Sequence, residues 1–493
     1  MANVIIFTGI AESGLYRYVG PYQVANRLRE RGYTVQVVDF LPWIIKDDLE
    51  NFWKILKKFV DKDTLWIGFS TTFFKNLRQP RSIRIESQND NTPFFIQEQI
   101  EIKQYVRSIS PKCRFVIGGA RAWIKTGEYL IDTYIEGYSD ESVIKFTEWC
   151  EGKNPFLQFT VHNDISAISI VDDPKAVGFD FTNHKFSWHN SDHVFQGEAV
   201  PVELARGCIF SCAFCNYPLN GKKKLDYVKN PEILLEQFIE NYETWGITRY
   251  SFTDDTYNDN VDKLEMLYEK VFSKLPFELK FSCYLRLDLL NAHPHTVELL
   301  QVSGLENAFF GIESLNYESN KAIGKGIKLD KVVNVLGKID DVFEGNIRTE
   351  GSFIFGLPYD SEASIRSWMT TLGNECNFGS VRLHPLQIRP SRKDKSVWSS
   401  VIDKNPEKYG YTMLDHMRWV NNAGLTYGKA VELFDEFMPK FANKIPTLNI
   451  NAMLNIGCNL EEARYMEQTQ ENMDKWWKEK EKRINQYVNI LLG

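Results

Sequence analysis

The sequence has no excess of positive charge and no long apolar run. It contains 58 Lys and Arg against 65 Asp and Glu, which gives a formal net charge of −7 over 493 residues. This balance provides no general basic surface for nucleic-acid phosphates, so we do not expect a nucleic acid as partner. No segment approaches the roughly 18 consecutive apolar residues that a membrane span requires. The first residues also lack the basic stretch of a signal peptide, so we expect no membrane association.

Cysteine is scarce as well. Eight cysteines in a chain of this length are too few for the disulfide framework of a secreted protein, which indicates a reducing, cytoplasmic location. Hydrophobic residues make up 43% of the chain, enough to form the cores of two or three domains. The aromatic fraction of 14% predicts that these cores or their pockets are rich in rings.

Short apolar runs alternate with amphipathic stretches over the first 150 residues. Apolar runs at 4–8, 34–40 and 65–70 are typical of buried strands. The alternation predicts a parallel, doubly wound sheet, so we expect a Rossmann-like domain over residues 1–150. Residues 71–92 interrupt the pattern with an irregular stretch, and a loop of that length is usually functional or disordered. This stretch contains four basic residues: Lys75, Arg78, Arg81 and Arg84.

The rest of the chain falls into three parts. Residues 151–200 are polar and irregular, and we interpret them as a linker with short strands. Residues 201–394 again alternate strand and helix patterns, with six strands. This predicts a partial (β/α)6 barrel whose reactive centre lies at the carboxyl ends of the strands. Residues 395–493 show helical patterns, so we expect a helical C-terminal domain and an α/β fold class for the whole chain.

Three cysteines follow the first predicted strand of this barrel at close spacing. Residues 206–216 read Arg-Gly-Cys-Ile-Phe-Ser-Cys-Ala-Phe-Cys-Asn, so three and then two residues separate Cys208, Cys212 and Cys215. Three thiolates in one short loop can bind three irons of a [4Fe-4S] cluster and leave the fourth iron open for a substrate or cofactor. The alternatives are a zinc site or unrelated buried thiols. Zinc normally takes a fourth Cys or His at ligand spacing, and none follows within twenty residues of Cys215.

This Cys-x3-Cys-x2-Cys loop, with Phe214 before the last cysteine, resembles the signature of the radical S-adenosylmethionine (SAM) superfamily. The resemblance covers about residues 200–390. In that family the amino and carboxylate groups of SAM bind the open iron. Reduction of the cluster then cleaves SAM to a 5′-deoxyadenosyl radical, which abstracts hydrogen from an unactivated carbon. The resemblance also implies an external electron donor of the flavodoxin or ferredoxin type.

The resemblance further implies SAM contacts at the ends of the later barrel strands. The candidates are Asp254, Asp255, Tyr284, Arg286, Glu313, Ser314 and Gly356. Asp254 and Asp255 stand where the family holds the SAM amino group, although the more usual motif there is Gly-Gly-Glu. Each residue alone has an ordinary alternative, since Arg286 or Glu313 would equally suit a surface ion pair. Their joint order along the chain favours the SAM interpretation.

Two glycine-containing turns in the first domain resemble the cobalamin-binding domain of one radical SAM branch, the class B methyltransferases. Residues 115–121 contain paired glycines after an apolar run, and residues 131–142 contain a Glu-Gly turn. Glycines at the end of a strand let a flat ligand approach the backbone closely. The alternative is a doubly wound domain without a ligand, because a fold alone implies no ligand. The resemblance implies cobalamin contacts at Ser70, Thr71, Gly118, Gly119, Glu136 and Gly137.

We therefore expect a radical SAM enzyme that uses cobalamin to methylate an unactivated carbon of a small molecule or peptide. Two alternatives stay open. One is a radical SAM rearrangement or oxidation without cobalamin. The other is a non-catalytic iron–sulfur protein that transfers electrons or senses oxygen. The sequence identifies neither the substrate nor a further catalytic residue.

Overall fold

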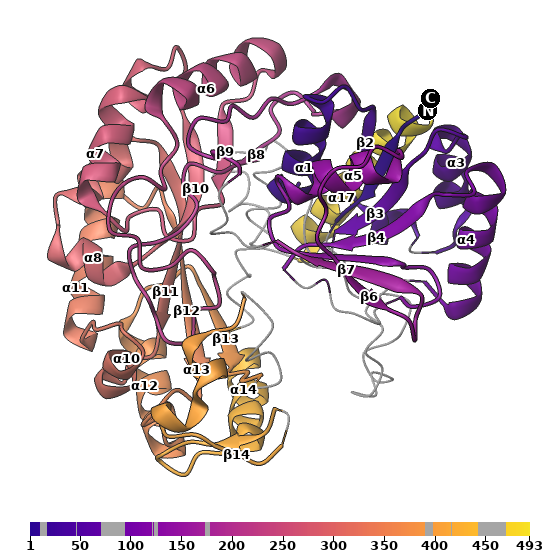
Figure 1. Cartoon of the computed structure of the whole chain (residues 1–493). Coiled ribbons are helices and arrows are strands. Elements are labelled where there is room, and N and C mark those ends of the chain that lie inside the picture. Colours follow the sequence, from indigo (N-terminus) through magenta and orange to yellow (C-terminus); the bar gives the residue numbers. More distant parts are fainter. Residues whose placement is uncertain are drawn as a thin grey trace.

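The chain forms two large sheets, each covered by helices (Figure 1). The structure is a computed structural model. It describes residues 1–9, 17–45, 47–70, 94–120, 122, 127–172, 178–389, 398–415, 417–441 and 470–493. Within these ranges, no helix combines the length and the apolar character that crossing a membrane demands.

The first sheet has seven strands in the order β2-β1-β3-β4-β5-β7-β6, and only the β6–β7 pair is antiparallel. Because β2 and β3 flank β1 on opposite sides, the sheet is doubly wound, as predicted. The strands are β1 (Val4–Phe7), β2 (Val35–Val38), β3 (Trp66–Ser70), β4 (Arg114–Gly118), β5 (Thr133–Glu136), β6 (Thr160–His162) and β7 (Ala167–Val171). The helices of this domain are α1 (Val19–Arg29), α2 (Leu41–Ile44), α3 (Glu50–Phe59), α4 (Ile96–Ile109) and α5 (Ser142–Cys150).

Residues 151–200, which we interpreted as a linker, contribute two strands to this sheet. β7 pairs with β5 in parallel, and β6 pairs with β7 at the edge. The pattern of β6 is weak because Thr160 and Val161 are exposed, as suits an edge strand with a solvated face. The first sheet therefore extends beyond residue 150.

The second sheet has six parallel strands that neighbour one another in chain order, which confirms the predicted partial barrel. The strands are β8 (Val200–Val202), β9 (Arg249–Phe252), β10 (Lys280–Leu285), β11 (Leu305–Glu313), β12 (Arg348–Phe355) and β13 (Ser380–Pro385). The helices that follow them are α6 (Pro231–Trp245), α7 (Val261–Lys270), α8 (Leu287–Ala292), α9 (Thr296–Val302), α10 (Tyr317–Ala322), α11 (Leu329–Phe343) and α12 (Glu362–Glu375).

One face of the second sheet stays accessible to solvent. Partly exposed residues alternate with buried ones along β9 and β10, and again near the end of β13. The buried set faces the helices, since the Tyr250 ring lies 4.6 Å from that of Phe238 in α6. Successive side chains of a strand point to opposite faces, so the accessible set faces the inside of the barrel. The inner face of the barrel is therefore partly exposed at β9, at β10 and near the end of β13.

The C-terminal region divides between the two sheets, whereas we expected one helical domain. α13 (Val401–Lys404), the small hairpin β14 (Thr412–Met413) and β15 (Trp419–Val420), and α14 (Tyr427–Phe441) belong to the barrel side, where α14 packs on β13. The last helix, α17 (Gln470–Leu492), packs on α3 of the first domain (Figure 1). Ile484, Tyr487 and Leu491 are buried in the core of that domain. The apolar face of α17 is therefore covered by the N-terminal part of the chain.

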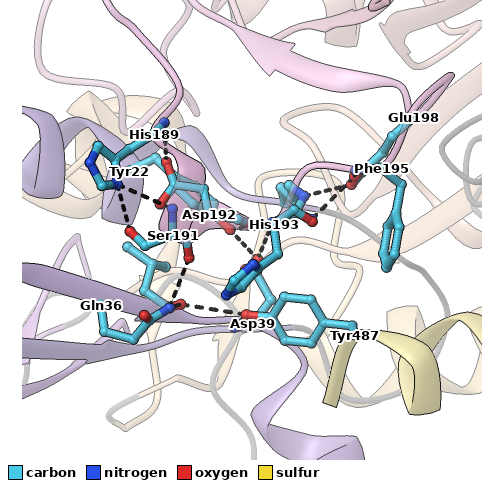
Figure 2. Close-up of polar contacts among 12 residues, drawn as sticks. Tyr22, Gln36, Asp39, His189, Ser191, Asp192, His193, Phe195, Glu198 and Tyr487 are labelled. Carbon is cyan, nitrogen blue, oxygen red and sulfur yellow. Dashed lines mark hydrogen bonds and ion pairs between the residues drawn. The ribbon is translucent and has the colours of Figure 1, made fainter. Parts of the chain in front are cut away.

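A buried polar network joins α17 and the segment before β8 to the first sheet (Figure 2). The guanidinium of Arg17 lies 2.8 Å from the carboxylate of Asp39 and 2.6 Å from that of Glu198. The hydroxyl of Tyr22 donates to Asp39, and the backbone N–H of Asp39 donates to the hydroxyl of Tyr487. Burial raises the pKa of Asp39 to about 6 although Arg17 acts in the opposite direction. Charges removed from water need such partners, so the network fixes how these segments meet.

The free energy of unfolding should fall as the pH rises, and it should fall less in Asp360→Asn than in the wild type. Asp360 is fully buried, accepts hydrogen bonds from Ser319 Oγ and from the N–H of Leu357, and has its pKa raised to about 7 by burial. An unfolded Asp has a pKa of about 3.9, so the folded state binds the extra proton between these values. The contribution of this carboxyl group to the free energy of unfolding is largest below about pH 4 and falls as the pH rises to about 7.

Asn resembles the protonated carboxyl and does not titrate. Urea unfolding at pH 5 and pH 8 should give a difference in unfolding free energy that is about 1–3 kcal/mol smaller in Asp360→Asn than in the wild type. Asp341→Asn, on the exposed side of α11, serves as control and should leave the difference unchanged. If Asp360→Asn and Asp341→Asn gave the same difference in unfolding free energy between the two pH values, the raised pKa of Asp360 would be contradicted.

Candidate active site

The three cysteines lie in the loop that follows β8, at the carboxyl end of the barrel sheet. Cys208 is buried, and Cys212 and Cys215 are half-buried. Gly207 begins the loop with a φ of +118°, and a Cβ there would lie 2.5 Å from the carbonyl oxygen of Leu219. Only glycine suits that position, because other residues are strained at this φ and would collide with the neighbouring backbone.

A buried acidic residue holds the start of this loop. Asp259 Oδ2 accepts hydrogen bonds from the N–H of Ile209 at 3.1 Å and from the hydroxyl of Tyr227 at 2.7 Å. Its other oxygen pairs with Lys263 at 2.5 Å, and both side chains are fully buried. A paired and hydrogen-bonded buried charge fixes geometry well, so the loop is preorganised. Sequence reasoning did not single out Asp259, because one Asp after a strand carries no distinctive signal.

Two further side chains donate hydrogen bonds to the thiols. Asn220 Nδ2 lies 3.2 Å from Cys215 Sγ, and Arg286 Nη1 lies 3.3 Å from Cys212 Sγ. Both donors would stabilise negative charge on sulfur. Burial raises the pKa of Cys208 and of Cys215 to about 11, so iron binding must displace their protons.

The other side of the loop rests on the segment between α10 and α11. The N–H of Ala213 donates to the carbonyl of Ile323 at 2.9 Å, and the N–H of Ile402 donates to the carbonyl of Ala213 at 3.0 Å. Among the described residues, no three Cys, His, Asp or Glu side chains are arranged around a single metal ion. A [4Fe-4S] cluster takes one thiolate on each of three irons, so its ligands need not converge on one point. The donor set and its hydrogen bonds fit such a cluster.

The two predicted acidic residues after β9 lie beside this loop and differ in their contacts. Asp254 Oδ1 accepts hydrogen bonds from the N–H groups of Leu204 and Ala205, so it positions the chain segment that leads from β8 to the cysteines. Asp255 Oδ2 is buried without a hydrogen-bond partner in the described structure. Burial, Asp254 and Glu203 together raise the pKa of Asp255 to about 7. A buried acceptor of this kind fits an incoming ammonium group such as that of SAM.

Other predicted SAM residues already have partners within the protein. Glu313, at a φ of +71°, pairs with Lys325 at 2.7 Å. The hydroxyl of Ser314 accepts the N–H of Asn316 at 3.0 Å. Gly356 leaves room for Trp419, since a Cβ would lie 2.1 Å from that ring. These contacts give Ser314 and Gly356 structural roles, and their predicted contacts with SAM stay predictions.

Tyr284 and residues that the sequence did not single out line the barrel interior. Tyr284 is 49% exposed, yet the surrounding protein raises the pKa of its hydroxyl, as happens for a side chain that lines a concave surface. Its ring lies 4.8 Å from that of Phe309. Arg382 pairs there with the buried Glu350, and His384 follows on the same face. No sequence signal marked them, because only strand alternation brings them together.

The predicted cobalamin residues gather at the carboxyl ends of three adjacent strands of the first sheet. Ser70 of β3 pairs in register with Gly118 of β4, and Gly118 pairs with Ile135 of β5. Gly119, Glu136 and Gly137 follow directly, whereas Thr71 lies outside the described residues. Among the described residues, a Cβ at Gly118 would have one neighbour within 4 Å, the carbonyl oxygen of Ile135 at 4.0 Å. Such an edge fits a flat ligand.

The turn after β5 touches the cluster loop. Arg206 is buried and pairs with Asp140 of this turn at 2.5 Å and with Glu203 at 2.9 Å. The guanidinium also lies 4.8 Å from the ring centre of Tyr138. The Tyr138 ring in turn lies 5.4 Å from that of Trp398. The glycine-bearing edge of the first sheet therefore lies next to the three cysteines.

These features define a partial-barrel protein with a three-cysteine cluster loop and a doubly wound domain beside it. Residues 202–372 match the Radical SAM superfamily. The chain therefore carries a radical SAM domain, which confirms the prediction from the cysteine spacing. Proteins of this superfamily use a [4Fe-4S] cluster and SAM.

Two curated relatives come from Chlorobaculum tepidum. Bacteriochlorophyllide d C-12(1)-methyltransferase is 28% identical over 181 residues, which cover 36% of this chain and 38% of the relative. Bacteriochlorophyllide d C-8(2)-methyltransferase is 26% identical over 175 residues, covering 33% and 37%. The matches thus span less than two fifths of the length of these relatives.

Two solved structures share the arrangement of the two sheets. The radical SAM methyltransferase TsrM from Kitasatospora setae, with tryptophan substrate and a SAM analogue bound, has a TM-score of 0.59 at 13% identity, covering 84% of this chain and 79% of that one. The cobalamin-dependent SAM radical enzyme OxsB, with aqua-cobalamin and SAM bound, has a TM-score of 0.54 at 12% identity, covering 99% and 71%. At such identities the likeness shows the fold.

Proposed function

We propose that this protein is a cobalamin-dependent radical SAM methyltransferase that acts on a small molecule. The observation that carries the proposal is the contact of Arg206 with Asp140 and Tyr138, which joins the cluster loop to the glycine edge of the first sheet. A ligand over Gly118 and a ligand on the cluster would then face each other across one space. Methyl transfer to a substrate carbon requires that proximity.

The chain's own residues would bind and orient the participants. When bound, the cluster with SAM supplies hydrogen-atom abstraction and cobalamin supplies methyl transfer. Cys208, Cys212 and Cys215 would hold the cluster. The free oxygen of Asp255 would accept the SAM ammonium group. The barrel interior around Tyr284 would receive the substrate and limit the access of water.

The comparisons support the methyl-transfer part of this proposal. Both curated relatives are named as methyltransferases, and one structural neighbour is a radical SAM methyltransferase with tryptophan as substrate. The other neighbour binds aqua-cobalamin and SAM. The target of our protein, an unactivated carbon of a small molecule, is part of the proposal.

Anaerobic purification with cobalamin, followed by cluster reconstitution, tests the proposal. We expect about four irons and about one cobalt for each chain, and formation of 5′-deoxyadenosine on reduction with SAM. Gly118→Phe should abolish cobalt binding and keep the iron, because its ring would occupy the space above β4. Gly337→Phe, on the exposed side of α11 with nothing within 4 Å, is the control and should keep both.

Two outcomes would contradict the proposal in different ways. Four irons without cobalt in the wild type would leave radical SAM chemistry that does not use cobalamin. Iron without any 5′-deoxyadenosine would favour a non-catalytic iron–sulfur protein.

A further inference from the structure

Three consecutive lysines stand directly beside the cluster loop. Lys223 and Lys224 are exposed and Lys222 is half-buried. Within the described structure, none of the three forms an ion pair with an acidic side chain. The chain as a whole is acidic, with a net charge of −7. An unpaired basic run in an acidic protein marks this surface as a place where negative charge is attracted.

Backbone hydrogen bonds join the lysine segment to the cysteines. The N–H of Lys222 donates to the carbonyl of Cys208 at 3.1 Å, and the N–H of Cys208 donates to the carbonyl of Leu219 at 3.3 Å. The N–H of Gly221 donates to the carbonyl of Phe210 at 3.0 Å. Asn220, in the same segment, donates to the thiol of Cys215. The lysines are therefore held against the cluster loop and do not belong to a separate surface turn.

The side chain of Lys222 lies over the start of the loop. A Cβ built on Gly207 would come within 3.0 Å of Lys222 Cε, so the aliphatic part of this lysine covers the residue before Cys208. Long basic side chains commonly pack their methylenes on protein and keep the ammonium group in water. Positive charge is thereby presented to solvent just outside the cluster ligands.

The proposed function requires an electron that the described part of the chain does not provide. Its residues hold no second group of Cys, His, Asp or Glu side chains that would bind a metal. An electron carrier that approaches the cluster loop from outside would supply this electron. One electron passes from the reduced carrier to the oxidised cluster, and the step consumes no proton and no further reagent.

We propose that Lys222, Lys223 and Lys224 form the docking surface for an acidic one-electron carrier protein of the flavodoxin type. This inference rests on the proposed radical SAM function. Attraction between the acidic carrier and the lysine surface orients the carrier toward the cluster loop. Such steering acts over about 10 Å at 0.1 M salt and weakens as ionic strength rises.

The test compares two triple variants with the same change of charge. K222E/K223E/K224E should lower the second-order rate constant of cluster reduction by an acidic flavodoxin at least about tenfold at low salt, and should remove most of its salt dependence. K57E/K62E/K112E changes three exposed lysines of the first domain, which are not part of the cluster loop, and should stay within about twofold of wild type. Equal slowing of both variants, or of neither, would overturn the proposal.

Two controls separate docking from damage to the site. Photoreduced deazariboflavin, a small carrier without an acidic surface, should reduce the cluster of all variants at the same rate. K223E/K224E keeps Lys222 over Gly207 and should still slow reduction by flavodoxin several-fold if the surface docks the carrier. Wild-type speed with flavodoxin in K223E/K224E would overturn the proposal.

Binding of oxidised flavodoxin, followed by flavin fluorescence anisotropy, requires no electron transfer. It should weaken at least about tenfold in K222E/K223E/K224E and stay unchanged in K57E/K62E/K112E. This readout distinguishes the docking surface from the proposed function, because a protein that binds no cluster can still be assayed for flavodoxin binding. Unchanged binding in the first variant would refute the docking surface even if the enzyme proved active.

Discussion

Replacing Cys208, Cys212 and Cys215 together with alanine should remove all of the roughly four irons that the reconstituted protein holds. The three thiols are the protein's ligands in this prediction, and Asn220 and Arg286 donate to two of them. Without the thiolates these donors have no cluster sulfur ligand to stabilise. Iron and sulfide analysis, with the visible absorbance of the cluster, measures the loss. SAM cleavage should disappear with it.

The matched control is Cys150→Ala with Cys376→Ala. Both cysteines lie outside the cluster loop. This double variant should keep its full iron content, because neither thiol lies in the Cys-x3-Cys-x2-Cys loop. Retention of four irons by the triple variant would contradict the assignment of the ligands. Loss of iron from the control would show that iron content reports general damage.

Arg206→Met should lower the free energy of unfolding by about 3–5 kcal/mol. Arg206 has only 9% of its side chain exposed and pairs with Asp140 and Glu203. Methionine keeps the apolar stem but leaves two carboxylates buried without their partner. The rings of Tyr138 and Phe181, which lie 4.8 Å and 4.5 Å from the guanidinium, would also lose their cation. The first transition of a urea-unfolding curve measures this change in the free energy of unfolding.

Arg366→Met provides the comparison. Arg366 also pairs with two carboxylates, Glu362 and Glu436, but its side chain is 43% exposed. Water screens and replaces such contacts, so this variant should lose much less stability than Arg206→Met. A loss for Arg206→Met as small as that for Arg366→Met would show that the buried contact does not hold the two domains together. Reduced cobalamin binding in Arg206→Met should accompany its loss of stability.

Strand positions and the cluster motif could be predicted from local pattern. The apolar runs at β1, β2 and β3 are buried on both faces, which makes them continuous in sequence and easy to recognise. The cysteine loop was equally recognisable, because its ligands lie within eight residues of one another. β6 was missed as part of the first sheet because an exposed edge strand has little apolar pattern. β7 is mostly buried, but its pairing with β5 joins segments more than 30 residues apart, which no local pattern shows.

Contacts between distant segments could not be predicted in this way. Arg286 was a candidate for SAM, yet it lies 3.3 Å from Cys212 Sγ and 3.9 Å from the ring centre of Phe210. Asp259 and Asn220, which hold the loop and one thiol, carry no motif. The assignment of α17 to the first domain depends on Tyr487 meeting Asp39 across 448 residues. No local periodicity contains that information.

The sequence by itself determined the α/β class and the partial barrel, and it predicts the three cluster cysteines, because each depends on spacing between near neighbours in the chain. Only the tertiary structure decided which oxygens of the acidic residues beside the cysteines lack a hydrogen-bond partner among the described residues, and which residues line the barrel. It also decided that the turn after β5 meets Arg206. The physical reason is that burial and pairing of a side chain depend on segments far away in sequence, which come together only when the sheets pack.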